Sequence, residues 1–250
     1  MATKNRPGFL QQAIKYYQRQ SFRDSELIIV DDSDSSCANL LPKSSRFRHI
    51  RLPPHTILGE KLNIAIENSS GSIIQKLDDD DYYHPRFLET TVSTLVHRRH
   101  RDSVVAMGAF LVLIVGHPRL YSAGQGWFAG GTLCFRREAW NRKPFRHLSW
   151  REDVAFLEDH PELHKLPVSN PELYVLVRHG NHTWNTIQPE LGTNPTDASH
   201  HQMNVTHYFS GCSPYHKTIS EIMPAEDAQF YDDLCKLDDF SRIHPARILA

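Results

Sequence analysis

The sequence lacks several features that assign proteins to common classes. Its four cysteines lie far apart without a CxxC pair, which excludes a thiolate zinc site and a disulfide framework. With 28 Lys and Arg against 29 Asp and Glu, the chain has no long-range positive field to recruit nucleic acid. Its most apolar run, residues 104–115, is shorter than the roughly 20 residues that cross a bilayer as a helix.

The chain also begins without a basic segment followed by an apolar one, which is the pattern of a secretory signal. We therefore expect a cytoplasmic protein, or one peripheral to a membrane, without a transmembrane segment. Its 250 residues are enough for a sizeable core, and α/β folds of this length commonly form one domain.

Short β-branched runs alternate with helical patterns, which predicts an α/β protein. Apolar residues at i, i+4, i+7 and i+8 mark one of these helices, and the strands read as buried and parallel. The expected elements are a helix beginning near Asn5 and Pro7, strands at 26–30 and 48–52, a helix over 58–66, a strand at 72–77, a helix from Pro85 and a buried strand within 104–115.

Four consecutive aspartates, residues 78–81, follow the expected strand at 72–77 directly. Ligands of open α/β sheets bind at the carboxyl ends of strands, so this position favours a function. The four carboxylates repel one another, and oxygen-only ligands suit Mg²⁺ or Mn²⁺. A solvated acidic turn is the alternative. An EF-hand is excluded because Tyr83 stands where its sharp turn needs glycine.

Four segments occur in an order that resembles a family 2 glycosyltransferase of the GT-A fold: ATKNRP at 2–7, LIIVDDSDSS at 27–36, GEKLNIAIENSSGSIIQKLDDDDYYHP at 59–85 and WREDVAF at 150–156. The resemblance covers roughly residues 2–185. It implies a Rossmann-like α/β fold, with a single domain over 1–250 and a mixed, mostly parallel sheet flanked by helices. Residues 1–100 would bind the nucleotide sugar, 101–185 the acceptor, and 186–250 would form an irregular segment and a C-terminal helix.

The resemblance also implies a donor site. Asp32 would recognise the nucleotide base, Thr3 would border the base, and Lys61 and Asn63 would flank the donor. From the residues alone, Asp32 is equally a turn cap, Asn63 a helix-surface residue and Lys61 a solvated cation.

The same resemblance implies a site for Mn²⁺ or Mg²⁺ that bridges the donor phosphates. Asp80 would be the metal ligand, Asp78 would contact ribose or metal, and Asp81 would support the loop. His179 would complete the metal site, with His182 as the alternative.

Sugar transfer requires a base, because the acceptor hydroxyl has a pKa far above neutrality. By resemblance, Asp153 would be this base and Glu152 would orient it or the acceptor. The alternative is that both acids stabilise a helix N-terminus. As the nucleoside diphosphate departs, Lys61 and the cation would offset its charge. Gly130–Phe135 would form a strand below the sugar, and Trp127 or Trp150 would stack on an acceptor or lie in the core.

The pattern departs from the family where Ala2 replaces the usual proline and the first central strand is expected to be missing. No QxxRW-like motif follows Glu152–Asp153, which argues against a processive synthase and favours a single transfer per encounter. The main hypothesis is an inverting transfer to a saccharide or other hydroxyl. Two alternatives remain: a catalytically inactive GT-A domain that binds or scaffolds, and another metal-dependent nucleotide enzyme such as a nucleotidyltransferase. The latter usually has a glycine-rich phosphate loop near its N-terminus.

Overall fold

The structure is a computed structural model, and its described residues fall into two compact units. Unit 1 comprises 1–109 and 126–174, and unit 2 comprises 110–125 and 175–250. Whether they form the expected single domain stays a prediction. The structure describes residues 1–97, 100–115, 119–123, 126–179 and 213–234.

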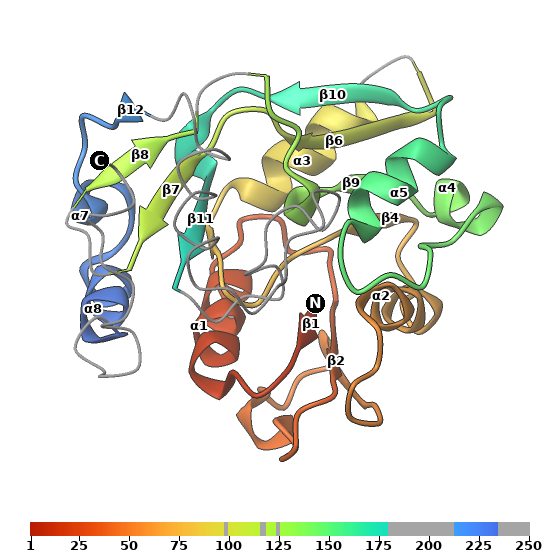
Figure 1. The fold of residues 1–250 in the computed structure, drawn as a ribbon, viewed down its shortest axis with the longest axis horizontal. Coiled ribbons are helices and arrows are strands. Elements are labelled where there is room, and N and C mark those ends of the chain that lie inside the picture. The colour runs from red at the N-terminus through yellow and green to blue at the C-terminus, as the bar shows by residue number, and fades with distance from the viewer. Residues whose placement is uncertain (98–99, 116–118, 124–125, 180–212, 235–250) are drawn as a thin grey trace, which may run out of the picture. The chain divides into compact units, whose positions relative to one another are not determined.

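The first sheet of unit 1 has three parallel strands in the order β1-β2-β3. These are β1 (Ala2–Thr3), β2 (Leu27–Asp31) and β3 (Phe47–Arg51) (Figure 1). The first strand, expected to be missing, is thus present as a two-residue strand. It pairs with β2 through Ala2 opposite Val30.

Two helices accompany this sheet, α1 (Pro7–Gln18) and α2 (Leu58–Glu67). Pro7 is the first residue of α1, as predicted, but Arg6 rather than Asn5 is its N-cap. Asn5 has a left-handed backbone (φ 53°), and its side chain exchanges hydrogen bonds with Asp34 instead. That exchange explains why an Asn in this position does not cap the helix.

The second sheet of unit 1 has the strand order β10-β6-β9-β4. β10 and β6 are parallel, whereas β9 is antiparallel to both β6 and β4. The strands are β4 (Ile73–Gln75), β6 (Ser103–Met107), β9 (Cys134–Arg136) and β10 (His164–Val168), and the remaining elements of unit 1 are β5 (Tyr82–Tyr83), α3 (Phe87–Val96), α4 (Arg137–Arg142) and α5 (Glu152–Asp159).

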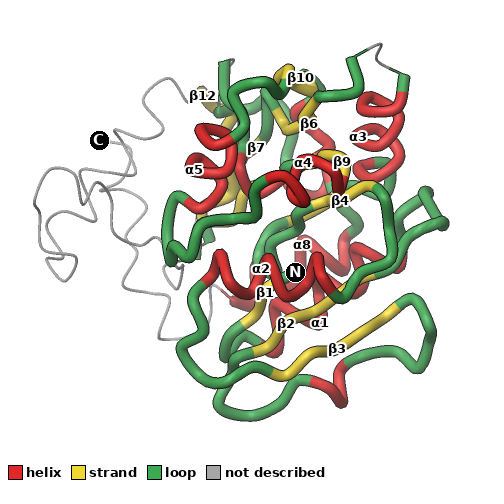
Figure 2. Tube along the Cα trace, turned by 90° about the vertical axis from the view of Figure 1, so that its right-hand side faces the viewer, coloured by secondary structure: helices red, strands yellow, loops and turns green. Residues whose placement is uncertain are grey.

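Helix α2 lies between the two sheets of unit 1 (Figure 2). Ala65 packs with Ile28 of β2, while Leu62 and Ile66 pack with Phe135 of β9. The apolar stripe predicted from the spacing of this helix is therefore its buried face, and it supports the strand ends on both sides.

An apolar cavity of about 300 Å³ lies between β2 and β4. Its walls include Met1, Ile28, Leu62, Ile74 and Phe135. β1 and β4 are edge strands of their respective sheets, so the two sheets are not joined by strand pairing.

In unit 2, neighbouring strands have the order β12-β8-β7-β11. β11 begins at Tyr174, the last residue of unit 1, and is parallel to β7. The elements are β7 (Leu111–Ile114), β8 (Leu120–Ser122), β11 (Tyr174–Arg178), β12 (Ser213–Pro214), α7 (Ile219–Ile222) and α8 (Ala225–Leu234).

The apolar run 104–115 was expected to form buried strand, and it does, but as two strands rather than one. It forms β6 and β7, which belong to different units. Between β6 and β7, the backbone N–H groups of Gly108 and Ala109 both donate to the Val168 carbonyl. This shared contact follows the end of β6 at Met107. A Cβ on Gly108 would lie 2.5 Å from that of Pro167, so glycine permits this close approach.

The mixed α/β class with helices flanking the sheets is confirmed. Within the described residues, every helix is too short or too polar to cross a membrane. Of the segment 186–250, expected to be irregular before a C-terminal helix, the structure describes residues 213–234, which include α8.

Candidate functional site

The four aspartates at 78–81, here called the acidic turn, lie between β4 and β5 of unit 1, at the predicted strand end. They are not equivalent. Asp79 and Asp81 are buried, whereas Asp78 and Asp80 are partly exposed. Asp81 accepts a hydrogen bond from the Tyr174 hydroxyl at 2.5 Å. Only Asp78 and Asp80 therefore present carboxylate oxygens toward an accessible surface.

Two cationic side chains neutralise part of this charge. Arg6 approaches Asp79 at 2.6 Å and Asp80 at 2.5 Å. On the other side, the Lys76 ammonium lies 3.7 Å from an Asp78 carboxylate oxygen. Neither Arg6 nor Lys76 was predicted as a site residue from the sequence, yet both approach the acidic turn directly.

Lys76 also joins the acidic turn to the expected acceptor side. Its ammonium donates to Glu152 Oε1 at 2.8 Å, and Glu152 is only 4% exposed. Glu152 and Asp153 occupy the first turn of α5, as predicted, after Arg151 in a left-handed conformation. The carboxylates expected on the donor side and those expected on the acceptor side are thus neighbours within unit 1.

The glycine pair Gly130–Gly131 separates these carboxylates. A Cβ on Gly130 would overlap the Asp153 carboxylate. On Gly131, a Cβ would lie 2.5 Å from Asp78 Oδ2. The backbone thus approaches both carboxylates closely, which the absence of side chains on these glycines permits. The glycines form a short 3₁₀ helix before β9 rather than part of the strand predicted over 130–135.

Burial raises the pKa of Asp78 to about 6; Lys76 opposes this shift, and the nearby carboxylates add to it. Burial likewise raises the pKa of Asp79 to about 7, although Arg6 opposes the shift. The ionised acidic turn is therefore electrostatically costly, and a further positive charge would stabilise it.

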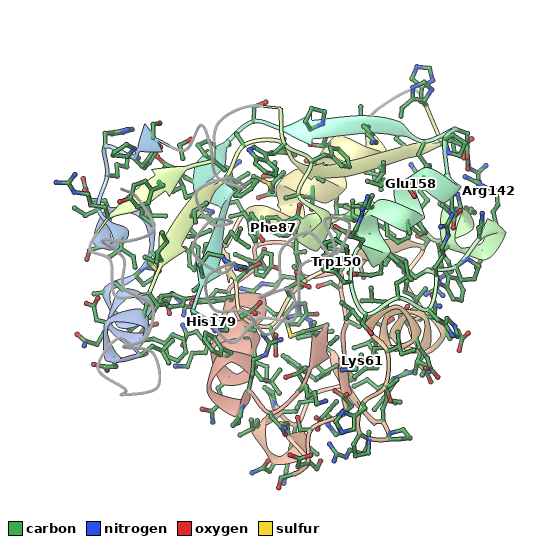
Figure 3. The ribbon with its side chains drawn as sticks, in the orientation of Figure 1. Lys61, Phe87, Arg142, Trp150, Glu158 and His179 are labelled. Atoms are coloured by element: carbon green, nitrogen blue, oxygen red, sulfur yellow. The ribbon has the colours of Figure 1, made fainter. Side chains whose placement is uncertain are left out.

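The expected base-binding residues lie on the adjacent sheet. Lys61 of α2 donates to Asp32 Oδ1 (Figure 3). The other oxygen, Asp32 Oδ2, and the hydroxyl of Thr3 are buried and have no hydrogen-bond partner among the described residues. Buried polar atoms are rarely left without partners in proteins, so both are positions where a polar ligand atom would be stabilised.

Asn63 has a different environment from the expected one. Its amide donates to the Phe145 carbonyl at 2.9 Å, and its oxygen accepts from Phe145 N–H and from the Trp140 indole. These bonds fix the chain after α4. A role in donor binding stays a prediction for Asn63.

His179 follows β11 in unit 2 and is 1% exposed (Figure 3). His182 lies outside the described residues, so the choice between the two as metal ligand stays a prediction. Within the described residues, no three His, Cys, Asp or Glu side chains are arranged to hold a metal.

Both tryptophans expected near an acceptor are partly buried. The Arg151 guanidinium lies 5.4 Å from the ring centroid of Trp150. That contact engages one face of the Trp150 ring, and stacking on an acceptor stays a prediction for Trp127 and Trp150.

The N-terminal part of the chain is similar in sequence to a known protein family. Residues 1–121 match the family model described as Glycosyl transferase family 2. The predicted resemblance to this family is confirmed. The family 2 match includes the expected donor residues and the acidic turn, but it ends before α5 and its two carboxylates.

Curated proteins that are similar to this chain carry glycosyltransferase or glucosyltransferase names. The Bacillus subtilis protein EpsE is 27% identical over 147 residues, which cover 52% of this chain and 52% of EpsE. A Campylobacter jejuni GalNAc(5)-diNAcBac-PP-undecaprenol beta-1,3-glucosyltransferase is 29% identical over 50% of this chain and 41% of its own. An uncharacterized glycosyltransferase of Haemophilus influenzae is 23% identical over 87% of this chain and 76% of its own. The chain thus spans about half the length of the first two relatives.

The fold resembles solved structures of TarS from S. aureus. A complex of TarS residues 1–349 with UDP-GlcNAc has a TM-score of 0.56 and 16% identity, covering 99% of this chain and 81% of TarS 1–349. A complex with UDP has a TM-score of 0.51 and covers 99% and 80%. At these identities, the similarity supports the fold alone.

Proposed function

We propose that this chain transfers a sugar from a nucleoside-diphosphate sugar to an acceptor hydroxyl, with inversion at the anomeric carbon. The observation that carries the proposal is the position of Lys76, whose ammonium lies within 4 Å of both Asp78 and Glu152. Two groups of carboxylates, 74 positions apart in sequence, therefore meet at one place, as a two-substrate reaction requires. The family 2 match supports the same chemistry.

The donor would bind along the carboxyl ends of β1, β2 and β4. Asp32 Oδ2 and Thr3 Oγ1 offer buried acceptor oxygens to the base or ribose. Lys61 orients the Asp32 carboxylate, since it donates to its other oxygen. A nucleoside diphosphate is the donor type that places a phosphate pair beside the acidic turn.

The acidic turn fits a divalent cation that shares its coordination with the donor. Mg²⁺ and similar ions are commonly held by one or two carboxylates together with substrate phosphates, rather than by an all-protein cage. Asp78 and Asp80 would supply the carboxylates, and the desolvated cluster favours added positive charge. When bound, Mn²⁺ or Mg²⁺ would offset the charge that develops on the leaving diphosphate.

Asp153 would accept the proton of the attacking hydroxyl. Of the two acids at the start of α5, Glu152 is buried and bound to Lys76, whereas Asp153 is partly exposed beside Gly130. A base must reach its proton, and this favours Asp153. One in-line displacement without a covalent intermediate would invert the anomeric configuration.

Removal of the proposed metal ligand tests this function. We expect Asp80→Ala to weaken binding of UDP-GlcNAc in the presence of Mn²⁺ by at least about tenfold, because a charged contact is lost. Isothermal titration calorimetry measures the affinity, and circular dichroism verifies the fold. Asp24→Ala, which removes an exposed carboxylate of the same unit, is the matched control. Equal, metal-dependent binding by both variants would exclude Asp80 as a ligand.

A further inference from the structure

Arg6 links two aspartates of the acidic turn through separate nitrogens. It is the N-cap residue of α1, directly before Pro7. One terminal nitrogen lies 2.6 Å from Asp79 Oδ1, and the other donates to Asp80 Oδ2 at 2.5 Å. A single guanidinium thus offsets the negative charge of two neighbouring carboxylates, the second of which is 74 positions further along the chain.

The two contacts differ in their surroundings. The Asp79 side chain is 1% exposed, whereas those of Asp80 and Arg6 are 12% and 13% exposed. The Asp79 contact has ion-pair distance but not hydrogen-bond geometry, so Asp79 depends on the nearby positive charge. The Asp80 contact borders the accessible side of the turn, where a ligand can compete for the carboxylate.

Arg6 and a divalent cation would compete for Asp80. A cation coordinated by Asp80 would place two positive centres against one carboxylate, and charges this close repel strongly in a partly buried site. Release of one Arg6 nitrogen removes the repulsion. That nitrogen would then lie beside the donor phosphates, which guanidinium groups bind well because of their planar donor geometry.

We propose that Arg6 is an internal counter-ion that a divalent cation replaces at Asp80, and that the released arm then binds the donor diphosphate. The contact with Asp79 persists throughout. This inference rests on the proposed function, because the cation and the diphosphate come from it. In this exchange, Arg6 weakens binding of the cation alone and strengthens binding of the diphosphate. The cation and the diphosphate are therefore expected to bind together.

The opposite signs can be measured with Arg6→Gln. Calorimetry with MnCl₂ alone should show tighter binding than in the wild type, by about tenfold, the usual effect of one charge-assisted hydrogen bond. Titration of UDP at saturating Mn²⁺ should show weaker binding by a similar factor. A merely structural loss would weaken both, so it does not produce this pair of results.

Two further variants make the result interpretable. Arg6→Gln leaves Asp79 buried beside no guanidinium, so Arg6→Gln/Asp79→Asn, which removes both partners, is measured alongside it and both are checked by thermal unfolding. Arg86→Gln is the matched control for net charge, because Arg86 is 71% exposed and lies 3.6 Å from Glu89. We expect Arg86→Gln to bind Mn²⁺ and UDP as the wild type does.

The reference for the double variant is Asp79→Asn, which lacks the same carboxylate. The proposal is overturned if the folded double variant binds Mn²⁺ no more tightly than Asp79→Asn. It is also overturned if the UDP affinity of Arg6→Gln is unchanged or rises. A transfer assay of the wild type decides the proposed function separately: absence of transfer with the opposite shifts present refutes only the function. Transfer with equal Mn²⁺ affinity in the double variant and Asp79→Asn refutes only the exchange at Asp80.

Discussion

Asp153 and Glu152 are adjacent acids in different environments. This difference supports the proposed roles, with Asp153 as the base and Glu152 as the orienting group. Glu152 is bound to Lys76 in a buried ion pair, which holds it in place and withdraws it from solvent. Asp153 lies against Gly130 and remains partly exposed. The first of these adjacent residues is therefore held in place by an ion pair and the second remains accessible, which supports the proposed roles of orienting group and proton acceptor.

Asp153→Asn removes the carboxylate that is proposed to accept the proton of the attacking hydroxyl, while retaining the shape of the side chain. We expect kcat to fall by about 10²–10⁴, the usual contribution of general base catalysis, with donor affinity little changed. A product assay with a nucleotide sugar gives kcat, and calorimetry gives the donor affinity. Glu158→Gln, on the exposed face of the same helix, is the control (Figure 3). Undiminished transfer in Asp153→Asn would show that another group takes the proton.

Asp31 organises the loop that follows Asp32, and its ionisation contributes to stability. Burial by itself raises the pKa of Asp31, but hydrogen bonds from Ser33, Cys37 and His49 hold it well below its ordinary value. The unfolded chain therefore takes up this proton more readily than the folded one. The contribution is present above about pH 4 and is lost as the pH falls below that value.

Asp31→Asn should destabilise the protein at pH 7 by about 1–3 kcal/mol, because buried N–H groups lose a charged acceptor. At pH 3 the difference from the wild type should be smaller, because the unfolded wild-type chain is then increasingly protonated at Asp31 while the folded carboxylate stays ionised, which lowers the stability of the folded wild type. Urea unfolding at both pH values measures this. The control is Asp24→Asn at an exposed site. An equal difference at pH 7 and pH 3 would contradict the role assigned to the ionised carboxylate.

The 3₁₀ helix Gly130–Thr132 brings the backbone against two carboxylates at once. Such an approach leaves no volume for a side chain at Gly130. The element therefore acts as a spacer that sets how near Asp153 and Asp78 lie to each other.

Gly130→Ala should displace the Asp153 carboxylate, because the new methyl group would occupy its position. A misplacement of roughly 1 Å reduces turnover by about 10²-fold, and we expect this effect on kcat with a smaller effect on donor affinity. Steady-state kinetics measure both. In Gly8→Ala, the added Cβ meets nothing within 4 Å, so this variant should retain wild-type turnover. Wild-type kcat in Gly130→Ala would contradict the spacer role.

The predicted helices and strands correspond closely to α1, β2, β3, α2, β4 and α3 because their signals are local. Pro7 favours a helix start, and the α2 stripe repeats at helical spacing. The division of the run 104–115 into two strands was not predicted because hydrophobicity alone does not reveal where a strand ends. The end of β6 involves a close approach of Gly108 to Pro167, although the two residues are far apart in sequence.

Ligand binding should stabilise the whole molecule, because a ligand that binds only the folded state shifts the unfolding equilibrium. At 100 times its Kd, a donor contributes about 2.7 kcal/mol, and for a protein of this size each kcal/mol raises Tm by roughly 2–4 °C. Thermal shift measurements with a panel of nucleotide sugars and Mn²⁺ should identify a donor that raises Tm by roughly 5–10 °C. Omission of Mn²⁺ should reduce the shift. A panel without any metal-dependent shift would contradict the proposed donor site.

By itself, the sequence determined the class of fold, the order of most elements in unit 1 and the place of the acidic turn after a strand. These follow from side-chain periodicity and from helix and strand boundaries, which neighbouring residues control.

Only the tertiary structure decided which charges meet. Arg6 reaches Asp80 across 74 positions of sequence, and Lys76 reaches Glu152 across 76. No local pattern encodes such pairs, because they arise when packing of α2 and the two sheets brings distant strand ends together. For the same reason, the engagement of Asn63 with Phe145 and Trp140 was visible only in the folded chain.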